Sequence, residues 1–279
     1  MAQTAPPAGA FDVTHRMVLG LALPMTFGFL TIPLLGITST AVAGRLGDPA
    51  MLAGLAIGAV LFDLIFATFN FLRASTTALV AQAWGRGERA EQEAVFWRAL
   101  LTALAIGIGI VVLSPLLLRL GLMIMSPDAS AAAATAQWFA LRILSGPAAL
   151  ANYAILGFLL GSGRAKTGLV LQALINGINI ALCIVFGLTM KGGVIASQVY
   201  TPMAATMAAG MTPPLGIALA TVTGETIGAL VGLVVVLGGF AQRNPLRIEN
   251  LLDRQKLTAL FSLNIDIMIR TFVLLAAFL

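Results

Sequence analysis

The chain has 279 residues, of which 59% are hydrophobic and only 10% are charged, and its mean hydropathy is +0.99. Soluble globular proteins carry about 25% charged residues, so this composition excludes an ordinary soluble domain and indicates a polytopic membrane protein. The net charge of +5 comes from arginine and lysine, which in membrane proteins mark cytoplasmic loops. No basic patch interleaved with aromatic residues supports nucleic-acid binding, and the single cysteine excludes an internal disulfide.

Residues 1–16 form a short N-terminal tail without a basic residue before Arg16. A secretory signal places basic residues ahead of its apolar stretch, so we interpret the first apolar segment as an uncleaved spanning helix. Each span needs about 20 mostly apolar residues. Seven segments meet this requirement, and they predict an all-α membrane bundle with spans at 17–43, 51–84, 94–118, 131–161, 166–189, 214–240 and 257–279.

Basic residues are distributed unevenly among the connecting segments. With the N-terminus inside, ten of them fall in inside segments and three in outside loops. The positive-inside rule therefore predicts a multi-pass protein of the cytoplasmic (inner) membrane with a cytoplasmic N-terminus, in contact with the lipid bilayer. The inside set is Arg16, Arg86, Arg89, Arg98, Arg164, Lys166, Arg243, Arg247, Arg254 and Lys256; the outside set is Arg45, Arg119 and Lys191.

Two connections differ from the short turns of a typical helical bundle. Residues 190–213 form a long outside loop rich in methionine, alanine and threonine, whereas most such connections have about 2–8 residues. This loop lies at the membrane interface, is disordered, or acts as a lid, and its pattern leaves these alternatives open. Residues 241–256 form a basic cytoplasmic linker, after which the sequence stops at Leu279 inside the seventh predicted span.

Charged side chains at membrane depth cost roughly 2.5–3.5 kcal/mol each on insertion scales, so each of them needs a reason. The second span carries Asp63 and, ten residues later, Arg73; the fourth carries Arg142. The simpler hypothesis is that Asp63 pairs with Arg73 or Arg142 and locks its helix into the bundle, and the alternative is a transport role. In the seventh span, Asp266 and Arg270 have the i, i+4 spacing of a structural ion pair.

The sixth span combines an acid with a stripe of small residues. Glu225 is either a cavity carboxylate or a hydrogen-bonding group in the packing, and the sequence leaves both open. Glycine recurs every four residues beside it, which predicts the close approach of another helix; these are Gly224, Gly228 and Gly232.

The fifth span carries a row of polar groups on one face of an otherwise apolar helix. At 3.6 residues per turn, Gln172, Asn176, Asn179 and Cys183 fall on one narrow stripe. Amides in membrane helices also bond neighbouring helices, at about 0.6 kcal/mol on average. Four groups on one line favour a wet cavity wall over such packing bonds.

Other classes of membrane protein lack their required residues. An intramembrane serine protease needs a Ser–His pair, but the one histidine, His15, precedes the first span, and no G-x-G-D motif supports an aspartyl protease. A retinal-binding protein needs a lysine deep in its seventh helix, and Lys256 lies at the edge. We therefore expect no enzyme, no metal site and no cofactor.

Four stretches resemble one transporter family, the multidrug and toxic compound extrusion (MATE) family, in its DinF-like branch. The resemblance covers nearly the whole chain except the 190–213 loop. The stretches are PLLGITSTAVAGRLGD (33–48), LFDLIFATFNFLRASTTALVAQAWGRGER (61–89), GPAALANYAILGFLLGSGRAKTGLVLQALINGINIAL (146–182) and LNIDIMIRTFVLLAAF (263–278).

The resemblance implies a fold and an activity. Family members have twelve helices in two six-helix lobes that rock between inward and outward states. Residues 17–240 would be the N-terminal lobe, and residues 257–279 the first helix of a second lobe that is otherwise missing. The function implied is export of organic cations or drugs by H⁺- or Na⁺-coupled antiport. The alternative is a truncated, transport-inactive relative, or a half-transporter that needs a partner lobe.

Two departures from the family pattern bear on coupling. The branch typically has G-x-V-D-T-A-V in helix one and N-x-x-N-x-x-L-D in helix five, but this sequence has Ser39 and Cys183 where the two acids belong. Neither a serine hydroxyl nor a thiol in apolar surroundings exchanges protons near neutral pH. Asn152 and Thr221 match the family's polar cavity residues, and Asp63 and Glu225 remain as the deep acids of the lobe.

Overall fold

The computed structural model describes residues 14–45, 47–190 and 213–240, and this part of the chain is helical without a strand. The helices are α1 (His15–Arg45), α2 (Pro49–Thr68), α3 (Phe71–Gly85), α4 (Arg89–Met125), α5 (Ala129–Arg142), the 3-10 turn η1 (Ile143–Ser145), α6 (Gly146–Gly161), α7 (Ala165–Met190) and α10 (Pro213–Gly238).

These elements form six helices long and apolar enough to cross a membrane, because α2 continues into α3 and α5 continues through η1 into α6. The predicted all-α membrane bundle is confirmed for six of the seven spans. The seventh span with Asp266 and Arg270, the 241–256 linker and nearly all of the 190–213 loop lie outside the described residues.

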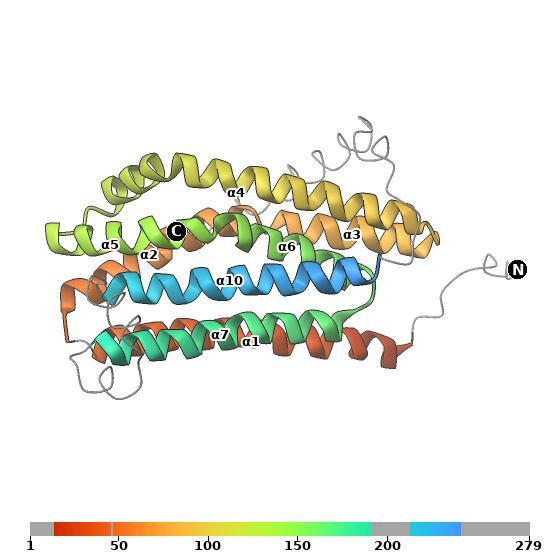
Figure 1. The fold of residues 1–279 in the computed structure, drawn as a ribbon, viewed down its shortest axis with the longest axis horizontal. Coiled ribbons are helices and arrows are strands. Elements are labelled where there is room, and N and C mark those ends of the chain that lie inside the picture. The colour runs from red at the N-terminus through yellow and green to blue at the C-terminus, as the bar shows by residue number, and fades with distance from the viewer. Residues whose placement is uncertain (1–13, 46, 191–212, 241–279) are drawn as a thin grey trace, which may run out of the picture.

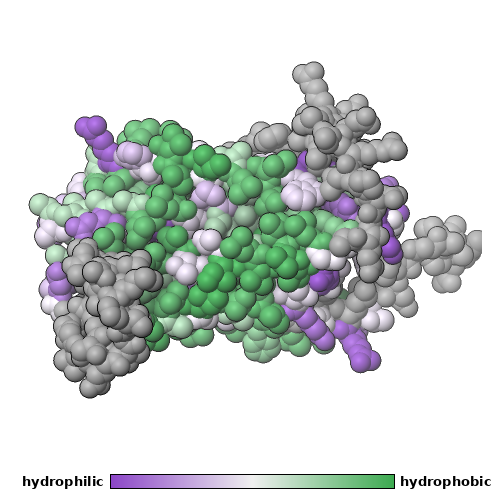
Figure 2. All heavy atoms as spheres, viewed as in Figure 1, coloured by the Kyte–Doolittle hydropathy of each residue, from purple (hydrophilic) through white to green (hydrophobic). Residues whose placement is uncertain are grey.

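The helices run side by side along the long axis of the molecule (Figure 1). Helix α10 packs against α7, α6 and α5, while α1 packs on α7, α3 and α4 pack on α6, and α2 packs on α5. On the face seen in Figure 2, apolar side chains cover the middle of the bundle, and hydrophilic side chains gather towards its two ends. This banded surface is what a helical bundle presents to a bilayer.

The small-residue stripe of α10 lies in close helix contacts, as its spacing predicts. A Cβ atom added to Gly224 would lie 3.0 Å from the carbonyl oxygen of Ile175 on α7. A Cβ atom on Gly232 would lie 2.8 Å from side-chain atoms of Ile155 on α6 and of Leu171 on α7. The glycines therefore let the three backbones approach more closely than larger residues would allow.

The break between α5 and α6 follows from local chemistry. Pro147 has no N–H to donate to the carbonyl of Ile143, so the regular α-helical ladder is interrupted there. The hydroxyl of Ser145 donates to the carbonyl of Arg142 at 2.8 Å and closes the 3-10 turn. As a result Arg142 is the last residue of α5, where the helix dipole favours a cation.

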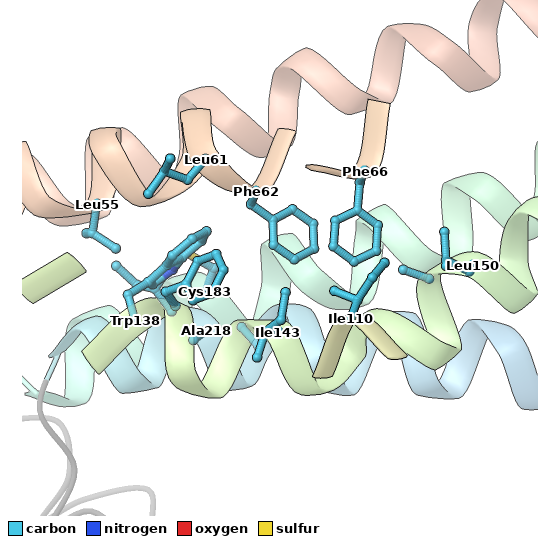
Figure 3. Close-up of a cluster of buried hydrophobic side chains, with 14 of the residues drawn as sticks. Leu55, Leu61, Phe62, Phe66, Ile110, Trp138, Ile143, Leu150, Cys183 and Ala218 are labelled. Atoms are coloured by element: carbon cyan, nitrogen blue, oxygen red, sulfur yellow. The ribbon is translucent and has the colours of Figure 1, made fainter. Parts of the chain in front are cut away.

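The buried side chains form two clusters. The first, the α2–α5 cluster, includes Phe62, Phe66, Trp138, Ile143 and Cys183 (Figure 3). The second, the α4–α6 cluster, includes Val80, Phe96, Phe158, Leu171 and Val236. The α2–α5 cluster borders the candidate site, whereas the α4–α6 cluster fills the end of the bundle near the start of α4.

Candidate functional site

A cavity of about 230 Å³ lies between α1, α2, α5 and α10. Its polar lining consists of Ser39 and Thr40 from α1, Asp63 from α2, Arg142 from α5 and Thr221 from α10. Apolar side chains complete the wall, and these include Leu35, Leu52, Leu55, Phe62, Trp138 and Ile217. The fold thus brings Ser39, Asp63, Thr221 and Arg142, which lie far apart in the sequence, to one space.

Arg142 is buried, with 8% of its surface exposed. Its Nη1 donates to the Ser145 hydroxyl, and its guanidinium carbon lies 3.7 Å from the ring centroid of Phe62. The Phe62 ring stacks on Phe66 with centroids 4.0 Å apart, and the two rings lie side by side in Figure 3. Such a contact between a cation and a ring face is stronger when water is excluded, so the rings offset part of the cost of burying the charge.

Asp63 is exposed on the cavity wall, one residue beyond Phe62. Within the described part of the chain, its carboxylate forms no ion pair, although Arg142 lies within electrostatic range. The other partner proposed for it, Arg73, lies with its guanidinium carbon 5.7 Å from the ring centroid of Tyr153. The structure therefore does not show the predicted lock between Asp63 and either arginine.

The polar stripe of α7 packs against neighbouring helices and does not line this cavity. Gln172 donates to Asn176 at 3.2 Å, and Asn176 donates to the Thr31 hydroxyl of α1. Further along, the Thr221 hydroxyl of α10 donates to Asn179 at 3.3 Å. The contacts of Asn176 with Thr31 and of Thr221 with Asn179 are the interhelical bonds of the simpler interpretation. The role of the stripe as a substrate or ion wall stays a prediction.

Cys183 ends the stripe and is fully buried, with no exposed surface. It lies in the α2–α5 cluster with Trp138 of α5 and Ala218 of α10 (Figure 3). Ser39, at the other position where the family has an acid, donates its hydroxyl to the carbonyl of Gly36 at 3.0 Å. Neither position supplies a carboxylate or a ready proton donor to the cavity.

Glu225 is held by a side chain from another helix. The Nδ2 of Asn152 on α6 donates to Glu225 Oε2 at 2.7 Å and to the Glu225 carbonyl at 3.0 Å. Glu225 also lies within electrostatic range of Arg142 but does not line the cavity. The packing role of Glu225 is therefore visible in the structure, and a role in coupling stays a prediction.

Sequence reasoning missed Trp138 and Phe62, which line the cavity beside Arg142. The indole Nε1 of Trp138 is buried without a hydrogen-bond partner among the described residues. The signal available was the spacing of Trp138 and Arg142, which are one helical turn apart on the same face. Among the described residues no cluster of side chains could hold a metal ion.

Comparisons with known proteins agree with this architecture. Residues 24–185 match the MatE family. The chain is 34% identical over 267 residues to DNA damage-inducible protein F of Escherichia coli K12, covering 92% of this chain and 52% of that protein. A shorter match, 52% identical over 69 residues, covers 20% of this chain and 12% of the PTS system fructose-specific EIIB'BC component of Xanthomonas campestris pv. campestris.

A solved structure shares the fold over most of the chain. It is described as the outward-facing conformation of a multidrug resistance MATE family transporter of the MOP superfamily, with a TM-score of 0.76 and 18% identity. The match covers 92% of this chain and 52% of that chain, so this sequence spans about half the length of its relatives. Because the family match covers more than half of the chain, the chain belongs to the MatE family.

Proposed function

We propose that this chain forms a six-helix lobe of a secondary active transporter of the multidrug efflux type. In this proposal it sits in the inner membrane with a cytoplasmic N-terminus and exports organic cations or drugs by H⁺- or Na⁺-coupled antiport. The connections that carry Arg86, Arg89 and Arg164 lie at the same end of the bundle as the start of α1 (Figure 1), which supports this orientation.

The observation that carries the proposal is the cavity itself. Ionisable side chains inside membrane spans are costly and mark substrate or ion pathways unless they are locked in pairs. Here Asp63 and Arg142 face one cavity of about 230 Å³ and form no ion pair with each other among the described residues. Apolar walls with a few placed polar groups are typical of small-molecule sites.

Coupling needs a carboxylate that exchanges its ion for substrate. Ser39 and Cys183 lack one, so the deep acids that remain in the lobe are Asp63 and Glu225. Glu225 is bonded by Asn152, whereas Asp63 faces the cavity without a hydrogen bond from the described residues. We therefore assign coupling to Asp63, which binds either the proton or Na⁺, or the cationic group of the substrate.

A second candidate is a transport-inactive relative, or a half-transporter that acts only with a partner lobe. The buried thiol of Cys183 and the Ser39 hydroxyl, bonded to its own helix, support it. These two groups occupy the positions where the family has its coupling acids.

The test is transport by the chain reconstituted in proteoliposomes with an imposed H⁺ or Na⁺ gradient. Ethidium serves as the cationic probe, and its gradient-dependent uptake is followed by fluorescence. We expect uptake that Asp63→Asn abolishes and that Asp48→Asn leaves intact, because Asp48 caps the start of α2 outside the cavity and asparagine also caps well. Gradient-driven uptake unaffected by Asp63→Asn would reject Asp63 as the coupling group, and no uptake at all would favour the second candidate.

A further inference from the structure

The charged wall of the cavity contains one cation and one anion that do not neutralise each other. Arg142 and Asp63 both line the space and lie within electrostatic range, yet no ion pair joins them in the described part of the chain. The third charge nearby, Glu225, is already bonded by Asn152 and lies outside the lining. The wall therefore offers a matched pair of opposite charges to a ligand.

The guanidinium of Arg142 has donors to spare. A guanidinium carries five N–H groups in a planar fork, and the described residues accept one bond from it, at Ser145. One face of the fork lies over Phe62, which leaves its edge for an acceptor in the cavity. A carboxylate is the acceptor that fits this fork best, since it can take two parallel N–H bonds.

We infer that this cavity selects small zwitterions of the amino-acid type, with the ligand carboxylate on Arg142, its ammonium group beside Asp63 and its apolar part against Trp138. This inference rests on the proposed function because it assigns a substrate class to the same cavity. A ligand with a cationic group alone binds through Asp63 but leaves Arg142 without an anion, and a ligand with a carboxylate alone leaves Asp63 without a cation. The two wall charges therefore favour a ligand that carries both groups over one of similar shape that carries either, which is how a site gains specificity.

The apolar part of such a ligand has a defined place. Trp138 meets the edge of Phe62 with ring centroids 6.2 Å apart, and both rings line the cavity with Leu55 and Ile217. An aromatic amino acid matches this combination of charge pair and ring surface.

The experiment compares three probes of similar shape on the unmodified chain in lipid nanodiscs, with binding measured by isothermal titration calorimetry. The probes are L-phenylalanine, 2-phenylethylamine, which lacks the carboxylate, and 3-phenylpropanoate, which lacks the amine. We expect L-phenylalanine to bind about tenfold or more tightly than either analogue, because each missing group forfeits a charge-assisted interaction. A tighter fit of either single-charge probe, or equal binding of all three, would overturn the inference.

Substitutions assign each charge to its ligand group. Arg142→Gln should remove the advantage of L-phenylalanine over 2-phenylethylamine, and Asp63→Asn its advantage over 3-phenylpropanoate. The matched control is Arg73→Gln, which removes a second intramembrane arginine that stacks on Tyr153 and does not line this cavity. Selectivity that survives Arg142→Gln, or that is lost equally in Arg73→Gln, would contradict the assignment, while the comparison of probes on the unmodified chain does not depend on any variant folding.

Binding and transport separate this inference from the proposed function. Gradient-driven ethidium uptake by a chain that shows no preference for L-phenylalanine would leave the transporter proposal intact and reject the zwitterion site. Selective binding of L-phenylalanine by a chain that moves neither ethidium nor the amino acid would support the site and reject the transporter proposal for this chain.

Discussion

Two buried arginines in apolar helices have opposite surroundings. Arg98 on α4 contacts Glu91 with Nη2 and Oε1 2.5 Å apart, and its Nε donates to the carbonyl of Ala94 at 3.1 Å. Arg142 on α5 has a hydroxyl and an aromatic face in place of a carboxylate contact. The charge of Arg98 is neutralised by a carboxylate of its own helix, whereas the guanidinium of Arg142 lines a cavity without a carboxylate partner among the described residues.

The packing around the two arginines differs in the same sense. Near the start of α4, the rings of Phe96, Phe158 and Phe240 meet edge to face with centroids 5.2–5.7 Å apart. Around Arg142 the rings of Phe62 and Trp138 border a space of about 230 Å³. The tightly packed rings near Arg98 stabilise the lobe, whereas the space beside Arg142 provides room for a ligand. The burial of an arginine therefore does not by itself mark a functional residue.

The largest expected effect is the loss of the closed ion pair. Arg98→Met removes the guanidinium that contacts Glu91 and should lower the free energy of unfolding by about 3 kcal/mol, at the low end for a buried pair because Glu91 is 17% exposed. The control is Arg86→Met, which breaks a surface pair whose side chains are 54% and 48% exposed and should cost under about 1 kcal/mol. Denaturant titration in detergent micelles measures both variants. Equal losses of unfolding free energy would show that the Arg98–Glu91 pair does not stabilise the fold more than a surface pair does.

The next effect compares one substitution in two regions. Gly232→Ala places a methyl group 2.8 Å from side-chain atoms of Ile155 and Leu171, and the overpacking should cost about 1–3 kcal/mol. Gly36→Ala on the cavity wall meets no atom within 4 Å and should stabilise its helix by about 0.5–1 kcal/mol. The same titration measures the pair, and the contrast fails if both variants change stability in the same direction.

A smaller effect on the free energy of unfolding is expected at Arg142. Arg142→Met breaks no ion pair among the described residues. It loses the bond to Ser145 and the contact with the Phe62 ring but also removes the cost of burying a charge, so the free energy of unfolding should change by about 1 kcal/mol or less. Denaturant titration of Arg142→Met and Arg98→Met under the same conditions measures the difference between the two arginines. A loss as large as that of Arg98→Met would mean that Arg142 is a structural lock.

The smallest effect concerns the start of α5, the helix that carries Arg142. The Ala131 N–H and the Ser130 hydroxyl donate to Asp128 at 2.8 and 2.5 Å, and these bonds hold the pKa of that carboxyl below its usual range. A depressed pKa contributes stability above the unfolded-state value, about 3.9, and the contribution fades as pH falls through the folded-state value. The melting temperature of Asp128→Asn should therefore lie slightly below that of the unmodified chain at pH 7 and match it in strong acid, and a difference that grows on acidification would contradict this sign.

Much of the architecture was predictable because membrane insertion leaves a strong sequence signal. Every span must be long, apolar and helical, since no water is present to satisfy the backbone inside the bilayer. The glycines of α10 were equally readable, because a stripe without side chains has few uses other than close helix contact. Length and periodicity alone carry both predictions.

The candidate site was predictable only in part. The sequence placed Gln172, Asn176, Asn179 and Cys183 on one face of α7, but what that face meets depends on how α1 and α10 dock. Asn176 bonds Thr31 of α1, Asn179 bonds Thr221 of α10, and Cys183 lies in the α2–α5 cluster. Whether Asp63 and Arg142 form an ion pair likewise depends on the distance between α2 and α5, and no local sequence pattern encodes that distance.

Hydropathy and helical period act within one segment, so they already specify a bundle of membrane helices and the helix faces that carry polar groups. Which of those faces meet each other, and which border a cavity, depends on the tertiary structure. Distances between helices depend on packing among segments far apart in the chain. In the packed structure Glu91 neutralises the charge of Arg98, whereas Arg142 and Asp63 face the cavity.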